Sequence, residues 1–246
     1  MKAETRAFPA SAQTRVPFAI VLAFLAGCAD SIGFLEFAQL FMSFMSGNTT
    51  RFGAAIALGD WDVAIRVGTT ILVFCLGAFM GTLLAAAVGH WRLAVLLGVQ
   101  ATLLGMGLTL PRGPVTFPFH AYPIVFALGL QNAVLQDEEG RSIALTYVTG
   151  AVVRFGTGLA NMLLGHPASS FWLQAPLWLA LTVGAIAGAT LHQWYGETAF
   201  LVPAVMAAVL AVVSLVLTLV YGDSRYVSSD RAPPPDAAPS APPTVG

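Results

Sequence analysis

Charged side chains are scarce in this chain, and three of them fall inside apolar stretches. Asp30, Arg51 and Arg154 lie near the middle of segments that are otherwise strongly apolar. An ionisable group at the centre of a bilayer costs about 2.5–3.5 kcal/mol on insertion scales, so such a group is a functional candidate by default. These three residues are therefore the first candidates for solute binding, proton coupling or ion pairing.

The two arginines share a local pattern. Residues 44–53 and residues 147–156, about 103 positions later, both contain Gly-x-x-x-Arg-Phe-Gly. Gly47 and Gly150 are expected to break the apolar segment, so that a new helix begins beside each of them. Free backbone amides and the positive end of a helix dipole would then face whatever precedes that helix. The pattern predicts two Gly-broken helices that begin at membrane depth.

Two such helix ends, each with an arginine one turn further on, would attract an anion. We expect the arginines to supply charge, Asn48 and Thr149 to supply hydrogen bonds, and Asp30 to balance the empty site or carry a coupling proton. The structural alternative is that the arginines pair with Asp30 and Glu138 and fasten helices together, or that they reach the interface.

Composition places the chain in a membrane. Of 246 residues, 57% are hydrophobic and 9% are charged, and the mean hydropathy is +0.78. Soluble domains carry about 25% charged residues. So much apolar surface cannot all be buried in a chain this short, so lipid must cover much of it. A net charge of −1 gives no basic field for nucleic acid.

The apolar segments predict an all-α, polytopic transmembrane bundle of six to eight segments. A crossing helix needs about 20 apolar residues, and every backbone amide in lipid must be bonded internally, which favours helices. The first segment starts at Val16, and a fifth strongly apolar run covers 167–191. Two further segments, about 40–59 and 142–165, hold one arginine each. The charge-free runs are 67–89, 93–111, 113–136 and 198–222.

The transmembrane domain, 16–222, reads as two internal repeats, about 17–111 and about 120–221. Asp30 aligns with Asn132, beside Gln131, and these three are candidates for coupling or ion pairing. Four segments recur in the same order: 17–38 with 120–140, 43–58 with 146–161, 64–88 with 171–192, and 93–111 with 199–221.

Paired glycines four residues apart recur in the third segment of each repeat. Gly77 and Gly81 match Gly184 and Gly188, both at an offset of 107 residues. Glycines at this spacing let two helix backbones approach closely in lipid. We expect them to pack helices together, either within one chain or between the copies of a homo-oligomer.

The number of crossings stays open at this stage. If all eight segments cross, the repeats are parallel; if 43–58 and 146–161 enter only part-way, six segments cross and the repeats are inverted. Loop Lys and Arg residues favour cytoplasmic termini by seven to two in both arrangements. Residues 1–15 form a short polar tail, and 223–246 form a Pro-rich tail that is expected to be disordered.

Two pairs of motifs carry a resemblance to a known family. Residues 27–35 followed by 44–49, and residues 129–133 followed by 146–150, resemble the signatures of the YoaK-like family of bacterial inner-membrane proteins. The likeness covers about residues 17–221. The family is filed as a domain of unknown function, so the resemblance implies a bacterial inner-membrane location and supplies no substrate or catalytic residue.

The leading functional hypothesis is a small-solute transporter or permease, with its site between the two Gly-broken helices. The alternative is a non-transporting assembly or lipid-binding scaffold. An intramembrane enzyme acting on lipid would need a reactive cluster at one depth, and no such cluster, metal site or cofactor motif is recognised in the sequence. The expected partners are membrane lipid and an unidentified solute.

Overall fold

The computed structural model describes residues 12–111, 113–114, 116–134, 148–166 and 174–223. Within these residues the chain forms helices and no strands, so the predicted all-α class is confirmed. Residues 1–11 and 224–246, which make up most of the two predicted tails, lie outside the described part. Residues 12–15 belong to the first helix, whose apolar span begins at Pro17.

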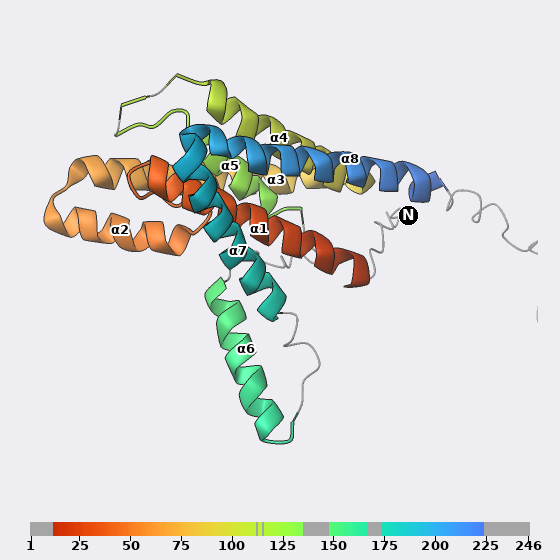
Figure 1. Ribbon diagram of the computed structural model, residues 1–246. Helices are drawn as coiled ribbons and strands as arrows, with labels where there is room; N and C mark the ends of the chain where they lie inside the picture. The colour runs from red at the N-terminus through yellow and green to blue at the C-terminus, as the bar shows by residue number, and fades with distance from the viewer. Residues whose placement is uncertain (1–11, 112, 115, 135–147, 167–173, 224–246) are drawn as a thin grey trace, which may run out of the picture.

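Eight α-helices follow one another in the described residues (Figure 1). Two short 3₁₀ helices, η1 (Gly89–Trp91) and η3 (Gly196–Phe200), join α3 to α4 and α7 to α8. The α-helices are α1 (Ala12–Glu36), α2 (Met45–Leu58), α3 (Trp61–Val88), α4 (Arg92–Thr109), α5 (Tyr122–Gln131), α6 (Val148–Leu163), α7 (Gln174–Tyr195) and α8 (Leu201–Asp223).

Three helical stretches are long and apolar enough to cross a membrane. They are Pro17–Glu36, Trp61–Thr109 and Gln174–Val220. The second stretch contains α3 and α4, and the third contains α7 and α8. In contrast, α5 has 10 residues, α2 has 14 and α6 has 16, all fewer than the about 20 that a perpendicular crossing needs.

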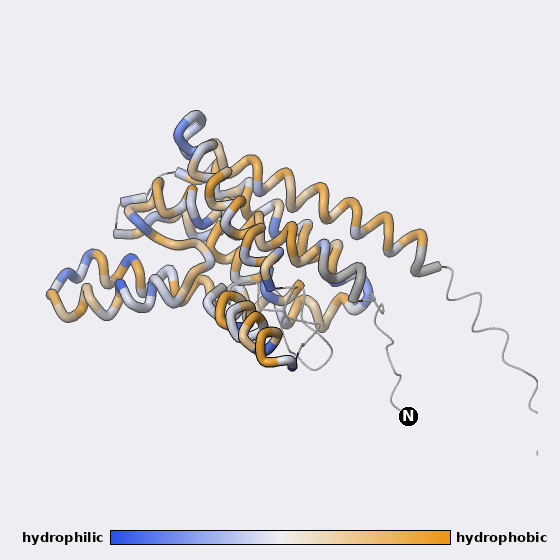
Figure 2. Tube along the Cα trace, turned by 60° about the horizontal axis from the view of Figure 1, so that its bottom comes forward, coloured by the Kyte–Doolittle hydropathy of each residue, from blue (hydrophilic) through white to orange (hydrophobic). Residues whose placement is uncertain are grey.

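The outer surface of the bundle is apolar. Figure 2 shows α8 as hydrophobic along nearly its whole length. Large apolar side chains are exposed on this helix at intervals of three and four residues, among them Val205, Val209, Val212, Val216 and Val220. In a protein bathed by lipid such a stripe needs no protein partner, because hydrocarbon covers it.

The helices pack in pairs. α1 lies against α7, α3 against α5, and α4 against α8, while α2 packs on α3 and α6 packs on α7 (Figure 1). The buried core lies where these pairs meet. It includes Leu25 and Ile32 of α1, Leu104 of α4, Leu128 of α5 and Phe200 of η3.

Glycine permits the close contact between α1 and α7. A methyl group on Gly184 of α7 would overlap the carbonyl oxygen of Phe24, and one on Gly188 would overlap that of Cys28. Gly27 of α1 lies equally close to the backbone of Leu181. Gly184 contacts Phe24 and, four residues later on both helices, Gly188 contacts Cys28. The two helices α1 and α7 therefore run in the same direction.

The contact between α3 and α5 is built in the same way. A methyl group on Gly77 would overlap the carbonyl oxygen of Phe126, and one on Gly81 would lie 2.9 Å from Cα of Leu130. From the other side, Gly129 lies against the carbonyl oxygen of Phe74. Every residue of this contact is matched in the α1–α7 contact, at an offset of 102 residues for α1 and α5 and 107 for α3 and α7.

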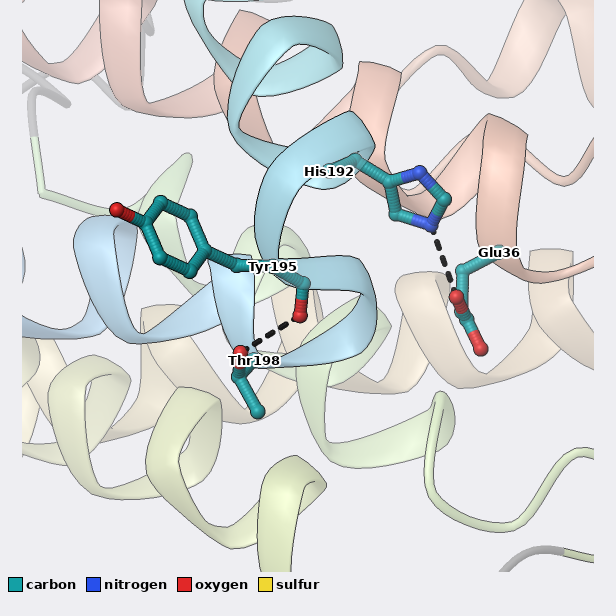
Figure 3. A network of polar contacts seen from close by, with 4 residues as sticks. All are labelled: Glu36, His192, Tyr195 and Thr198. Carbon is teal, nitrogen blue, oxygen red and sulfur yellow. Dashed lines mark hydrogen bonds and ion pairs between the residues drawn. The ribbon is translucent and has the colours of Figure 1, made fainter.

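A polar contact joins α1 and α7 where α1 ends. Figure 3 shows the imidazole of His192 facing the carboxylate of Glu36, with Nε2 and Oε2 2.9 Å apart. One turn later the hydroxyl of Thr198 donates to the carbonyl oxygen of Tyr195 at 2.7 Å, within the turn that leads into α8. These contacts fix the end of the α1–α7 pair beside the linker described next.

Candidate functional site

Residues 37–44, here called the α1–α2 linker, return the chain from the end of α1 to the start of α2. Asp30, two turns before the linker, accepts two hydrogen bonds from one linker residue. The backbone N–H of Ser43 lies 2.6 Å from Oδ1 and the Ser43 hydroxyl 2.5 Å from Oδ2. Hydrogen bonds to a carboxylate are among the stronger ones in proteins, so Asp30 anchors the linker to α1.

Asn48 holds the linker from the other side. Its side chain is fully buried and forms two hydrogen bonds with the backbone of Phe41, one as donor and one as acceptor. Nδ2 donates to the Phe41 carbonyl oxygen at 2.8 Å, and the Phe41 N–H donates to Oδ1 at 3.2 Å. The amide therefore satisfies both backbone polar groups of a linker residue and leaves little capacity for a solute.

Arg51 also binds the linker. Its guanidinium donates to the carbonyl oxygen of Gln39 and, at 3.1 Å, to that of Ala38. These two residues adopt positive φ values of 64° and 50°, a backbone region that is unusual for residues other than glycine. Arg51 thus stabilises a tight turn, and the expected pairing of Arg51 with Asp30 is not formed.

The second predicted half-site lies elsewhere. Arg154 is exposed on α6, where its Nε lies 3.3 Å from Oε1 of Gln174, and Thr149 is exposed one turn before it. Because α2 packs on α3 and α6 packs on α7, the structure does not assemble the two arginines into one site. Glu138, the other proposed partner, lies outside the described residues.

The predicted helix starts fall close to the glycines. Gly47 and Gly150 lie in the first turns of α2 and α6, which begin at Met45 and Val148. However, the N-terminus of α2 has no side-chain cap, because its N-cap residue is Phe44, whose side chain has no hydrogen-bond acceptor.

Gln131 and Asn132 contribute to the scaffold. Gln131 is buried at the end of α5, accepts a 2.6 Å hydrogen bond from Nε2 of Gln100 and donates to the carbonyl oxygen of Leu22 at 3.1 Å. It therefore connects α5 to α4 and α1. The amide of Asn132 donates to the carbonyl oxygens of Leu128 and Gly129 within its own helix end.

A pocket of about 450 Å³ lies between α1, the α1–α2 linker and α7. Its aromatic wall is formed by Phe34, Phe41 and Phe44, with ring centroids 5.0 Å apart for the first two and 5.2 Å for the last two. The remaining wall is mainly apolar, and the polar side chains that line it are Asp30, Ser31 and Ser43.

Asp30 is the charged residue of this pocket. No Lys, Arg or His lines it, and no ion pair joins Asp30 to the part of the chain that the structure describes. An apolar cavity with a few convergent polar groups is the usual form of a small-molecule site. The pocket is therefore the candidate functional site, and of the predicted residues only Asp30 lines it.

Sequence reasoning did not identify the aromatic wall or Ser43. The signal was present, since Phe41 and Phe44 flank Ser43 and Phe34 follows Asp30 by one helical turn. Aromatic residues are common throughout apolar helices, however, and only the folded linker reveals which of them face one cavity.

Apolar helices long enough to cross a bilayer, a lipid-compatible outer face and a pocket between helices define an integral membrane protein. Residues 18–213 match the family described as "Protein of unknown function (DUF1275)", and the chain belongs to this family. It is 34% identical over 208 residues to the UPF0700 transmembrane protein RA0705 of Rhizobium meliloti (strain 1021), a match that covers 85% of this chain and 89% of the relative. No solved structure matches the chain. The predicted membership of a membrane-protein family of unknown function is thereby confirmed.

Proposed function

We propose that this protein is a small-solute transporter or permease, and that the pocket beside Asp30 is its solute site. The observation that carries the proposal is a carboxylate without an ionic partner among the described residues, placed in an aromatic pocket between two helices of the bundle. Intramembrane ionisable groups that line a cavity are typical of transport pathways. Neither arginine lines this pocket, so the proposal does not retain the anion expected from the sequence.

We infer further that six helices cross the membrane: α1, α3, α4, α5, α7 and α8. Helix length alone does not decide this count, because α5 has 10 residues whereas α2 has 14 and α6 has 16. α5 is counted because its glycine contacts match those of α1, which is long and apolar enough to cross the bilayer. In Figure 1 α1 and α3 run in opposite directions, and the glycine contacts make α1 parallel to α7 and α3 parallel to α5. Successive helices among these six therefore run in alternating directions, as successive membrane crossings of one chain must.

With three crossings per half, the two halves are inverted repeats. The support for this arrangement is the residue-by-residue match between the α1–α7 and α3–α5 contacts. Inverted repeats that interlock across a pseudo-two-fold axis are a common architecture of secondary transporters, with the solute near the repeat interface. The pocket between α1 of the first half and α7 of the second lies at such an interface. We place the protein in the bacterial inner membrane, with both termini in the cytoplasm.

Two-sided accessibility of the pocket tests this function without knowledge of the solute. Ala189→Cys, in a background with Cys28→Ala and Cys75→Ala, places one thiol in the pocket wall on α7. A membrane-impermeant maleimide should label it in right-side-out vesicles and also in inverted vesicles, because a transporter exposes its site to each side in turn. The control thiol, Val212→Cys on the lipid-facing side of α8, should stay unlabelled from both sides.

Labelling of position 189 from one side only, or from neither, would contradict the transport proposal. One-sided labelling would instead favour a membrane binding module. A stoichiometric protein partner that protects position 189 would favour the assembly-scaffold alternative.

A further inference from the structure

We propose that the pocket beside Asp30 selects an organic cation with an apolar body, such as an alkyl or aryl amine or a quaternary ammonium compound. This inference rests on the proposed function for the location of the site and adds the chemical class of the solute. It depends on three properties of the pocket, namely its charge, its hydrogen-bonding groups and its aromatic wall.

The charge of the pocket favours a cation. Asp30 lies in the C-terminal half of α1, a helix long and apolar enough to span the bilayer, and has no ionic partner among the described residues. An intramembrane carboxylate without a counter-ion is costly, and the cost falls when a cation binds beside it. A bound ammonium group would supply the charge that neither Arg51 nor Arg154 supplies.

The side-chain hydrogen bonds leave the pocket without donors for an anion. The hydroxyl of Ser31 donates to the carbonyl oxygen of Cys28 at 3.0 Å. The N–H and hydroxyl of Ser43 both donate to Asp30. The backbone of Met42 and that of Phe44 also hydrogen-bond to the Asp30 carboxylate, which has acceptor sites and no donor when it is ionised. The polar groups of the wall therefore offer acceptors, which suit an ammonium N–H or a fixed positive charge.

The aromatic wall suits the same ligand. Phe34, Phe41 and Phe44 form a continuous cluster in the wall of the pocket. The face of an aromatic ring attracts a cation within about 6 Å of its centroid, and sets of such rings recognise quaternary ammonium groups. Leu181, Ala185 and Ala189 of α7 also line the pocket and give an apolar surface for the hydrocarbon part of the solute. The volume of about 450 Å³ lies within the usual range for small-molecule sites.

Three small aromatic probes of different charge test this inference. They are benzyltrimethylammonium, its uncharged carbon analogue neopentylbenzene, and benzenesulfonate. The fixed charge of the first probe removes any effect of probe protonation. Binding is measured by equilibrium titration of the purified full-length protein in detergent, at matched free probe concentrations.

The matched variants are Asp30→Asn and Asp60→Asn. Both replace one carboxylate by an amide, but Asp60 caps the N-terminus of α3, outside the pocket, where asparagine caps equally well. We expect benzyltrimethylammonium to bind the native protein and Asp60→Asn alike, and Asp30→Asn at least tenfold more weakly. A pocket-filling variant, Ala189→Leu, should weaken binding while it keeps the carboxylate.

Equal or tighter binding of neopentylbenzene or benzenesulfonate would overturn the inference, as would an unchanged affinity of Asp30→Asn for the cation. If such binding is lost in Ala189→Leu, the pocket remains a solute site and only the class of solute is wrong. Absence of cation binding to the native protein also overturns this inference, whereas the transport proposal is decided separately by labelling at position 189.

Discussion

Replacement of Asn48 by alanine distinguishes a structural amide from a solute ligand. The buried side chain makes one hydrogen bond in each direction with the backbone of Phe41, at 2.8 and 3.2 Å. Alanine leaves the N–H and the carbonyl oxygen of Phe41 without these partners. An unsatisfied buried polar group costs about 1–3 kcal/mol, so two such groups give a loss of about 2–6 kcal/mol in unfolding free energy.

Thr49→Ala is the control for this change. Thr49 is the next residue of the same helix turn, is exposed, and donates from its hydroxyl only to the carbonyl oxygen of Met45. Exposed substitutions of this kind change stability by about 0.5 kcal/mol or less. Both variants are unfolded by SDS titration in mixed micelles, and by heat, where about 2–4 °C per kcal/mol predicts a loss on the order of 10 °C for Asn48→Ala.

A stability of Asn48→Ala equal to that of Thr49→Ala would refute the structural role of Asn48. If Asn48→Ala kept its stability but failed to bind or transport solute, the Asn48 amide would be a solute ligand, as the sequence pattern first suggested. A stability loss that is restored by Asn48→Gln would weaken the geometric argument, because the longer side chain cannot keep both short bonds to Phe41.

Two further predictions concern the architecture. With six crossings and cytoplasmic termini, a cysteine at His90 is labelled by impermeant maleimide from the cytoplasmic side only and one at Pro114 from the periplasmic side only; the reverse pattern would contradict this arrangement. Gly184→Ala destabilises the protein by about 1–3 kcal/mol through overpacking against Phe24, although alanine is the better helix former. Gly53→Ala, where an added methyl group meets no atom within 4 Å, leaves stability unchanged or raises it by up to about 1 kcal/mol; equal effects at the two positions would contradict the close contact between α1 and α7.

The positions of many helices can be predicted from the sequence, because a membrane-spanning chain needs long apolar runs and a helical backbone. The predicted segments 93–111 and 199–221 differ from α4 and α8 by no more than two residues at either end. The starts of α2 and α6 also fall near the repeated glycines. These features are local, so a single segment carries enough information to predict them.

The site was less predictable, because the partners of its polar residues are set by the linker. Arg51 binds carbonyl oxygens 12 and 13 residues earlier, and Asp30 binds Ser43 13 residues later. Both contacts require Ala38 and Gln39 in a left-handed conformation, which their residue types do not suggest. A polar residue at membrane depth looks like a solute ligand in the sequence, whereas here several of them satisfy the backbone of a tight turn.

His192 illustrates the same limit over a longer distance. In the sequence it stands alone near the end of an apolar segment, and its partner Glu36 lies 156 residues away. The contact follows from the packing of α1 on α7, which in turn depends on close approach at Gly27 and Gly184. Spacing within one segment therefore could not reveal it.

Flux of a fixed-charge cation across a reconstituted membrane tests the central claim most directly. Purified protein is placed in liposomes, and uptake of radiolabelled benzyltrimethylammonium is followed for the native chain, Asp30→Asn and Asp60→Asn. The account predicts uptake above that of protein-free liposomes for the native chain and for Asp60→Asn, and uptake at the protein-free level for Asp30→Asn. Native uptake no faster than that of protein-free liposomes, or equal uptake by the native chain and Asp30→Asn, would contradict it.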